Sequence, residues 1–97
     1  MTKNALDCAK ESFRIESKVI MDTFDNMDFD AFGKAVDVIA GCGRIATSGC
    51  GHSGIACMHF AHSLCCIERP ARFISPAESV HGGMGFVQEG DVVVLAS

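Results

Sequence analysis

A short apolar run that leads into a glycine-rich loop decides the fold of this chain: Arg44-Ile45-Ala46-Thr47-Ser48-Gly49-Cys50-Gly51-His52-Ser53-Gly54-Ile55-Ala56. Residues 44–48 predict a strand, and the three glycines satisfy the spacing G-x-G-x-x-G before a helix predicted over residues 53–68. Glycine lets the backbone turn tightly and approach an anion, while the amides and dipole of the next helix stabilise negative charge. The stretch therefore predicts an anion site between a strand and a helix. The alternative is a turn that needs glycine only for its backbone.

The rest of the chain predicts two leading helices and two further strands. In chain order the additional elements are helices over 5–24 and 29–40, a strand over 71–75, a short helix over 77–81, a flexible segment or tight turn over 82–85 and a strand over 91–97. The last strand is apolar at every position from Val92 to Ala96, which is typical of a strand covered on both faces. This order predicts an α/β fold with a doubly wound parallel sheet, N-terminal helices and three strands.

The helix predicted over residues 53–68 has one apolar face and one polar face. The apolar side comprises Ala56, Cys57, Phe60, Ala61, Leu64 and Ile67. His59, His62, Ser63 and Cys66 fall on the opposite side. We therefore expect the first set to pack on the sheet and the two histidines to face solvent or another subunit.

The length of 97 residues predicts a single domain over residues 1–97, with a helical lead over 1–42 and a βαβ core over 43–97. A five-stranded sheet of this kind would need roughly 50 more residues at the observed spacing of strands. We therefore expect the domain to be incomplete at its C-terminal end.

Composition excludes several classes of protein. Hydrophobic residues make up 48% of the chain and charged residues 21%, which excludes intrinsic disorder. The net charge of −4 argues against a nucleic-acid binder. The longest uncharged apolar stretch, Gly54 to Leu64, is shorter than the ~20 residues of a membrane span. The N-terminus lacks an export-type apolar run, so we expect a cytoplasmic protein with its six cysteines reduced.

A metal site is the other explanation for the cysteines. Cys50, His52, Cys57, His59 and His62 lie within 13 residues. There is no C-x-x-C pair, and a helical H-x-x-H has no matching second pair. We therefore predict no metal.

The loop favours a single phosphate over a dinucleotide. A dinucleotide site expects an acidic residue about 20 positions after the glycines, where the second strand ends. Here that strand ends Ile74-Ser75-Pro76, and the nearest acid is Glu78. A nucleoside-triphosphate loop would need a Gly-Lys-Ser/Thr sequence, which is absent. Ser48 and Ser53 supply hydroxyl donors on either side of the loop.

Two segments carry a family resemblance. Residues 44–56 resemble the first phosphate-sugar loop of the SIS (sugar isomerase) domain. Ser75-Pro76-Ala77-Glu78-Ser79-Val80-His81-Gly82-Gly83-Met84-Gly85 is similar to the Pro-x-Glu-x-x-His-Gly-Asp-Leu-Gly stretch of the arabinose-5-phosphate isomerase branch. The resemblance covers about residues 30–97. It implies a flavodoxin-like or Rossmann-like α/β fold, phosphosugar binding, no cofactor and a homo-oligomer.

The resemblance also implies roles for individual residues. The substrate-binding set would be Ser48, Gly49, Cys50, Gly51, His52, Ser53 and Ser97, with Ser97 opening a second serine-rich loop. His81 would point into the sugar site, so His81 and His52 are the catalytic candidates. His52 replaces a lysine of the branch pattern, and Gly83 replaces an aspartate. These two departures leave the identity of the sugar open.

The resemblance therefore implies an aldose–ketose isomerase that acts through an enediol on a phosphorylated sugar. Such a reaction needs a base for the proton alpha to the carbonyl and an acid for the neighbouring oxygen. The first alternative is a regulatory or sensor domain that binds a phosphosugar without turnover. The second is a dinucleotide-binding Rossmann protein. Because one of two expected substrate loops is present, we expect no turnover by these 97 residues alone.

Overall fold

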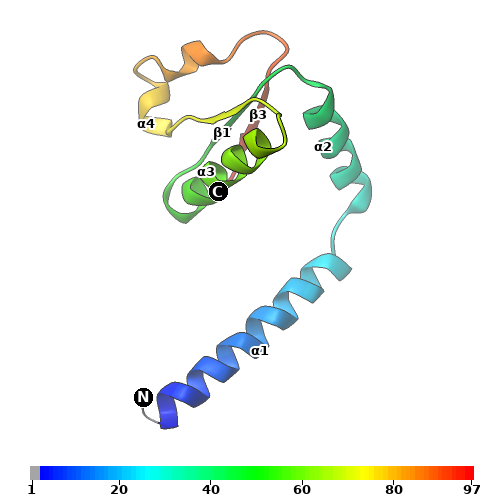
Figure 1. Cartoon of the computed structure of the whole chain (residues 1–97), viewed down its shortest axis with the longest axis vertical. Coiled ribbons are helices and arrows are strands. Elements are labelled where there is room, and N and C mark those ends of the chain that lie inside the picture. The colour runs from blue at the N-terminus through cyan, green and yellow to red at the C-terminus, as the bar shows by residue number, and fades with distance from the viewer. Residues whose placement is uncertain (1–2) are drawn as a thin grey trace. The chain divides into compact units, whose positions relative to one another are not determined.

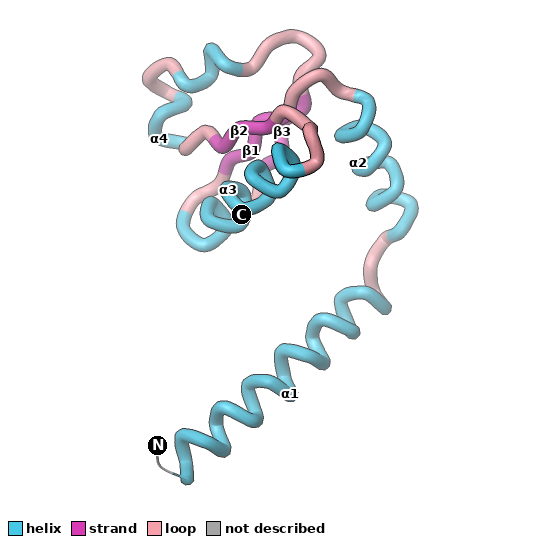
Figure 2. Tube along the Cα trace, in the orientation of Figure 1, coloured by secondary structure: helices cyan, strands magenta, loops and turns pink. Residues whose placement is uncertain are grey.

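The computed structural model describes residues 3–97 (Figures 1 and 2). The elements are α1 (Lys3–Asp25), α2 (Phe29–Gly41), β1 (Ile45–Ser48), α3 (Gly51–Cys66), β2 (Ala71–Phe73), α4 (Pro76–Ser79), the 3₁₀ helix η1 (Gly83–Phe86) and β3 (Val92–Leu95). Every element predicted from the sequence is present, and the turn predicted over residues 82–85 forms most of η1. The chain divides into two compact units, Met1–Gly33 and Lys34–Ser97, and each is described by itself.

The first unit consists of α1 and the start of α2. No glycine or proline interrupts α1, and Lys18 pairs with Asp22 one turn later. Asp28 begins the next helix, because its Oδ1 accepts a hydrogen bond from the amide of Ala31 at 3.0 Å. The rings of Phe24 and Phe29 meet edge to face across the turn, with centroids 5.2 Å apart.

The second unit is built on a parallel sheet with strand order β2-β1-β3. Right-handed crossovers place the connections on either side of β1 on opposite faces. Thr47 points toward α3, since its Oγ1 donates to the carbonyl of Cys57 at 2.9 Å. The neighbouring Ala46 and Ser48 point the other way and share a pocket with residues of α4 and η1. The prediction of an α/β fold with N-terminal helices and three parallel strands is confirmed.

The core lies between β1, the end of β2 and α3. Its buried apolar residues are Ile45, Ala46, Cys57, Ala61, Leu64 and Ile74. Cys57, Ala61 and Leu64 were expected on the packed face of α3, but Ala56, Phe60 and Ile67 are exposed. The packed face of α3 is narrower than predicted. The three strands described are short, so one row of α3 side chains is enough to cover them.

The prediction that β3 is covered on both faces is wrong for the described residues. Val93 is 44% exposed and Leu95 is 77% exposed, whereas Val92 and Val94 are half-buried. In the register of the sheet, Val93 lies beside Ala46 and Leu95 lies beside Ser48. The exposed side of β3 therefore continues the face of β1 that points away from α3.

Arg69 holds the end of α2 against the turn after α3. Glu68 adopts a left-handed conformation (φ 61°), and the amide of Arg69 bonds the carbonyl of Leu64 at 2.9 Å. The guanidinium then donates to the carbonyl of Ile39 at 2.8 Å and to the carbonyl of Cys42. All six cysteines are free thiols. Over residues 3–97, none of the helices combines the length and apolar character needed to cross a bilayer.

Candidate functional site

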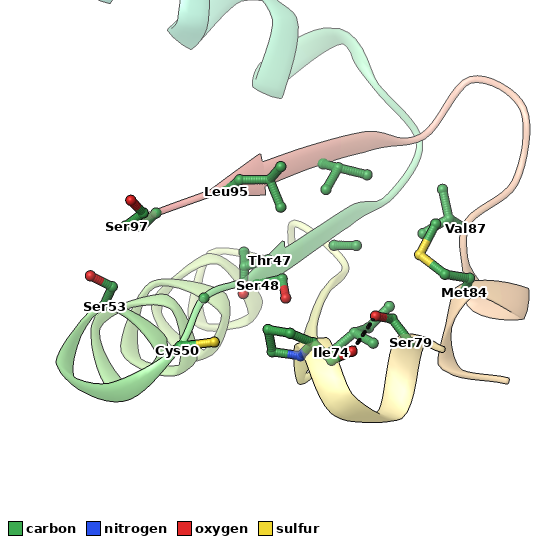
Figure 3. Close-up of a pocket in the computed structure, with 15 residues that line it drawn as sticks. Thr47, Ser48, Cys50, Ser53, Ile74, Ser79, Met84, Val87, Leu95 and Ser97 are labelled. Carbon is green, nitrogen blue, oxygen red and sulfur yellow. Dashed lines mark hydrogen bonds between the residues drawn. The ribbon is translucent and has the colours of Figure 1, made fainter. Parts of the chain in front are cut away.

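A pocket of about 590 Å³ opens at the carboxyl edge of the sheet, where parallel α/β folds bind their ligands (Figure 3). It collects residues from the ends of all three strands, from the loop before α3, and from α4 and η1. The lining residues are Ala46, Thr47, Ser48, Gly49, Cys50, Ser53, Ile74, Pro76, Ser79, Met84, Val87, Val93, Leu95, Ala96 and Ser97.

Three glycines shape the loop, each for a different reason. A Cβ on Gly49 would lie 2.7 Å from the carbonyl oxygen of Ala96. A Cβ on Gly54 would lie 2.4 Å from the carbonyl oxygen of Gly49. Gly51 has φ +56°, which other residues adopt at a cost. The glycine spacing is therefore explained by two close backbone approaches and one left-handed residue.

The loop delivers free amides to the pocket. The first hydrogen bond of α3 runs from the amide of Gly54 to the carbonyl of Cys50 at 3.1 Å. The amides of Gly51, His52 and Ser53 precede it and have no acceptor within the helix. No side chain caps this end of α3. The helix N-terminus therefore presents unpaired donors and the positive end of its dipole.

Three serine hydroxyls surround these donors. Ser48 ends β1, Ser53 lies in the first turn of α3, and Ser97 follows β3. Ser97 comes close because β3 pairs with β1 up to Ser48, whose carbonyl accepts from the amide of Ala96 at 3.1 Å. Across residues 3–97 none of the three hydroxyls has a protein partner. Together with the amides they suit an oxyanion.

The pocket has a polar end and an apolar end. Figure 3 shows Ser53 and Ser97 at one side, and Met84 and Val87 at the other. Sequence reasoning missed the apolar wall, to which Ile74, Val93 and Leu95 also contribute. The alternation of side chains along each strand was the available signal, because every second residue of β3 shares a face with Ser48.

The two candidate histidines lie outside this pocket. The structure brings Ser48, Gly49, Cys50, Ser53 and Ser97 together, but His52 and Gly51 do not line the pocket. His52 is exposed on α3. His81 is exposed after α4, and its amide donates to the carbonyl of Glu78 at 3.0 Å. His81 therefore does not line this pocket, and its place in the sugar site stays a prediction.

The lining carries no ionisable acid or base other than the thiol of Cys50, in the part of the chain that the structure describes. A phosphate there would meet no carboxylate side chain among the described lining residues. Within residues 3–97 no three His, Cys, Asp or Glu side chains are grouped so that they could hold a metal ion.

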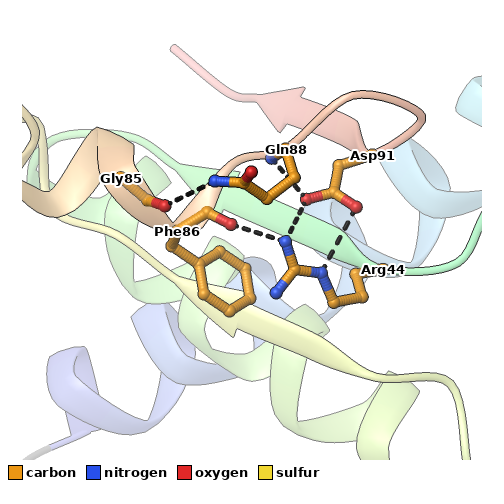
Figure 4. Close-up of polar contacts among 5 residues, drawn as sticks. All are labelled: Arg44, Gly85, Phe86, Gln88 and Asp91. Carbon is orange, nitrogen blue, oxygen red and sulfur yellow. Dashed lines mark hydrogen bonds and ion pairs between the residues drawn. The ribbon is translucent and has the colours of Figure 1, made fainter.

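A half-buried ion pair fixes the far wall of the pocket (Figure 4). The guanidinium of Arg44 donates to Asp91 through Nη2 at 2.7 Å and Nε at 3.3 Å, and to the carbonyl of Phe86 at 2.7 Å. Asp91 also accepts from the amide of Gln88 at 2.8 Å. The hydrogen bond from Arg44, followed by that from the Gln88 amide, holds the pKa of the Asp91 carboxyl below its usual value. The pair ties the start of β1 to the segment that ends η1.

Comparison with known proteins gives one family. The family model of the SIS domain matches residues 38–97, which confirms the resemblance seen in the motifs. A protein of Haemophilus influenzae called a probable arabinose 5-phosphate isomerase is 30% identical over 97% of this chain and 28% of its own length. The arabinose 5-phosphate isomerase KdsD of Pseudomonas aeruginosa is 39% identical over 70% of this chain and 21% of its own length.

Two solved structures are also similar to this chain. A putative sugar-phosphate isomerase of Listeria monocytogenes has a TM-score of 0.93 and 39% identity over the whole of this chain. An Escherichia coli protein in complex with A5P has a TM-score of 0.83 and 26% identity. The chain covers 52% of each of these two structures and between a fifth and a third of the curated relatives named above.

Proposed function

Because the chain belongs to the SIS domain family, we propose that it binds the phosphate of a phosphorylated sugar at the loop before α3, as part of an aldose–ketose isomerase. One observation carries the proposal: Ser48, Cys50, Ser53 and Ser97 all line one pocket, beside the amides that begin α3. A5P is the ligand of the Escherichia coli structure, so arabinose 5-phosphate is the first sugar to test.

The donors suit a phosphate dianion. Its oxygens would accept hydrogen bonds from the amides of Gly51 to Ser53 and from the free hydroxyls of the three serines. The lining adds no negative side chain that would repel it. The volume of about 590 Å³ lies within the range of small-molecule pockets.

The isomerase chemistry needs groups beyond this pocket. Moving a proton between two carbons requires a base near the sugar, and hydroxyls such as those of Ser48 and Ser79 are too weakly basic. His52 and His81 remain the candidates for this base. Neither lines the pocket of its own chain, so each would have to reach the sugar from outside that pocket. The proposal therefore assigns binding to these residues, and it predicts no turnover by residues 1–97 alone.

A regulatory or sensor domain is the second candidate function. The observation that favours it is the absence, in the described pocket lining, of any His, Lys, Asp or Glu. A pocket of this composition would bind a phosphosugar without converting it. The dinucleotide alternative has no support from the lining, which offers no carboxylate to a ribose in the described residues.

Calorimetric titration tests binding. Arabinose 5-phosphate should bind the chain and arabinose should not, because the phosphate supplies the contacts. Ser53→Ala should weaken binding about 10-fold, the loss of one charge-assisted hydrogen bond of roughly 1.5 kcal/mol. Ser79→Ala is the matched control, since its hydroxyl already donates to the carbonyl of Pro76 at 2.7 Å. Equal binding of the two sugars, or none, would contradict the proposal.

A chimera separates the isomerase from the sensor. The segment of the Pseudomonas aeruginosa isomerase that matches this chain is replaced by the corresponding 69 residues of this chain, with the parent enzyme as control. Circular dichroism checks that the chimera folds. Ketose formation by the chimera supports the isomerase, whereas binding without conversion supports the sensor.

A further inference from the structure

The side of the pocket away from Ser53 and Ser97 has an apolar wall (Figure 3). Three of its side chains, Ile74, Met84 and Val87, come from the segment that contains α4 and η1. None of the three side chains has an N–H, O–H or carbonyl group. A sugar held by its phosphate at the other side would therefore lay its remaining carbons against a surface that forms no hydrogen bonds through these side chains.

The polar groups of this segment already have partners within the chain. The carbonyl of Met84 accepts from the amide of Val87 at 3.0 Å. The carbonyls of Gly85 and Phe86 each accept from a side chain, at 2.9 Å and 2.7 Å. Ser79 is the one hydroxyl that the described segment adds to the lining, and it donates to a backbone carbonyl at 2.7 Å. The backbone around η1 therefore does not replace the hydrogen bonds that the side chains of the wall lack.

The glycine at position 83, where the branch pattern has an aspartate, adds no polar side chain beside Ile74. A Cβ on Gly83 would lie 2.9 Å from Cγ2 of Ile74 and 3.0 Å from the backbone carbonyl oxygen of Glu78. Ile74 is buried and the carbonyl belongs to α4, so a side chain at position 83 would require both to shift. The conformation of this segment is thus built around the absence of that carboxylate.

We propose that the ligand of this pocket is a deoxy sugar phosphate, which places a carbon without a hydroxyl against Ile74, Met84 and Val87. This preference rests on the proposed binding of phosphate at the loop before α3. A hydroxyl placed against the wall would leave water without gaining a hydrogen-bond partner, which disfavours binding. A CH₂ group in the same place removes apolar surface from water on both sides of the contact. The wall therefore favours a sugar that lacks this hydroxyl over the fully hydroxylated sugar.

Met84 is the position at which the wall can be changed without disturbing the core. It is 56% exposed, whereas Ile74 is 7% exposed and belongs to the core. Met84→Gln keeps the length of the side chain and adds an amide that can donate to or accept from a hydroxyl. The substitution should therefore remove the preference for the deoxy sugar. Val80→Gln is the matched control, since Val80 is 81% exposed and does not line the pocket.

Calorimetric titration of the chain tests this preference. Arabinose 5-phosphate is compared with its 2-deoxy analogue, which is 2-deoxyribose 5-phosphate, and with its 3-deoxy analogue. We expect at least one deoxy sugar to bind about 10-fold tighter than arabinose 5-phosphate, because one unpaired hydroxyl is removed. Met84→Gln should abolish this difference, and Val80→Gln should leave it unchanged. Equal or weaker binding of both deoxy sugars, or a preference that survives Met84→Gln, would overturn the proposal.

The same titrations separate this proposal from the proposed function on which it rests. If arabinose 5-phosphate binds and neither deoxy sugar binds more tightly, the phosphate site stands and the deoxy sugar is wrong. If none of the three sugars binds, phosphate binding itself is wrong. Aldose–ketose conversion needs the hydroxyl on C2. A preference for the 2-deoxy analogue alone would therefore favour the sensor, whereas a preference for the 3-deoxy analogue is compatible with the isomerase.

Discussion

Replacing Gly54 by alanine tests whether the tight loop is what makes the binding site. Gly54 lies in the first turn of α3 and is buried. A Cβ there would lie 2.4 Å from the carbonyl oxygen of Gly49 and 3.1 Å from its carbonyl carbon. Both atoms are backbone, so no side chain can turn away to make room. The loop itself must move by about 1 Å to restore an ordinary contact.

That displacement has two expected costs. Overpacking of this kind destabilises a protein by about 1–3 kcal/mol. The same loop positions Ser48 and the free amides, so a shift of about 1 Å would break at least one of the proposed hydrogen bonds to phosphate. A charge-assisted bond contributes about 1.5–3 kcal/mol, which corresponds to a loss of roughly 10-fold to 100-fold in affinity.

Urea unfolding followed by circular dichroism measures the first cost, and titration with arabinose 5-phosphate measures the second. Gly33→Ala is the matched control. Gly33 lies inside α2, and among the described residues nothing beyond its chain neighbours and the backbone of that helix lies within 4 Å of an added Cβ. The substitution should therefore stabilise the chain by up to about 1 kcal/mol. If Gly54→Ala unfolds within about 0.5 kcal/mol of the native chain and binds equally well, the reasoning fails.

Two further predictions concern the sheet and the wall of the pocket. Thr47→Val removes a buried hydroxyl that bonds Cys57 at 2.9 Å, so the free energy of unfolding in urea should fall by about 1 kcal/mol; an unchanged value would show that this bond contributes nothing. Because Arg44 lowers the pKa of Asp91 in the folded state, the stabilisation by this carboxylate is complete above its ordinary pKa of about 4 and is lost as the pH falls further. Thermal melts from pH 7 to pH 2 should therefore show a smaller acid loss for Asp91→Asn than for the native chain, and parallel curves would contradict this.

The strand–loop–helix unit was predictable because its signals are local. The spacing of apolar residues changes at residue 44 from a helical to a strand period, which indicates β1. The three glycines then indicate the loop, and an apolar stripe at helical spacing indicates α3. The serines of the site follow from their place at the ends of β1 and the start of α3. Ser97 was predicted to be a site residue from the family resemblance alone. The pairing of β3 with β1 brings it to the loop.

Other features depend on contacts that are distant in sequence. Arg44 and Asp91 are 47 residues apart, and nothing local predicts that they pair. The apolar wall formed by Met84 and Val87 lies in a glycine-rich stretch with no period of its own. His81 was placed in the sugar site by resemblance alone, and a short helix and a turn set its direction.

The most direct test of phosphate binding is a titration followed by amide chemical shifts. Arabinose 5-phosphate is added to the ¹⁵N-labelled chain, with arabinose as the control without phosphate. The account predicts saturating shifts that are largest for the amides of Gly49 to Gly54 and for Ser97, and that arabinose does not produce. Shifts that do not saturate, that arabinose reproduces, or that gather on residues away from this loop would contradict it.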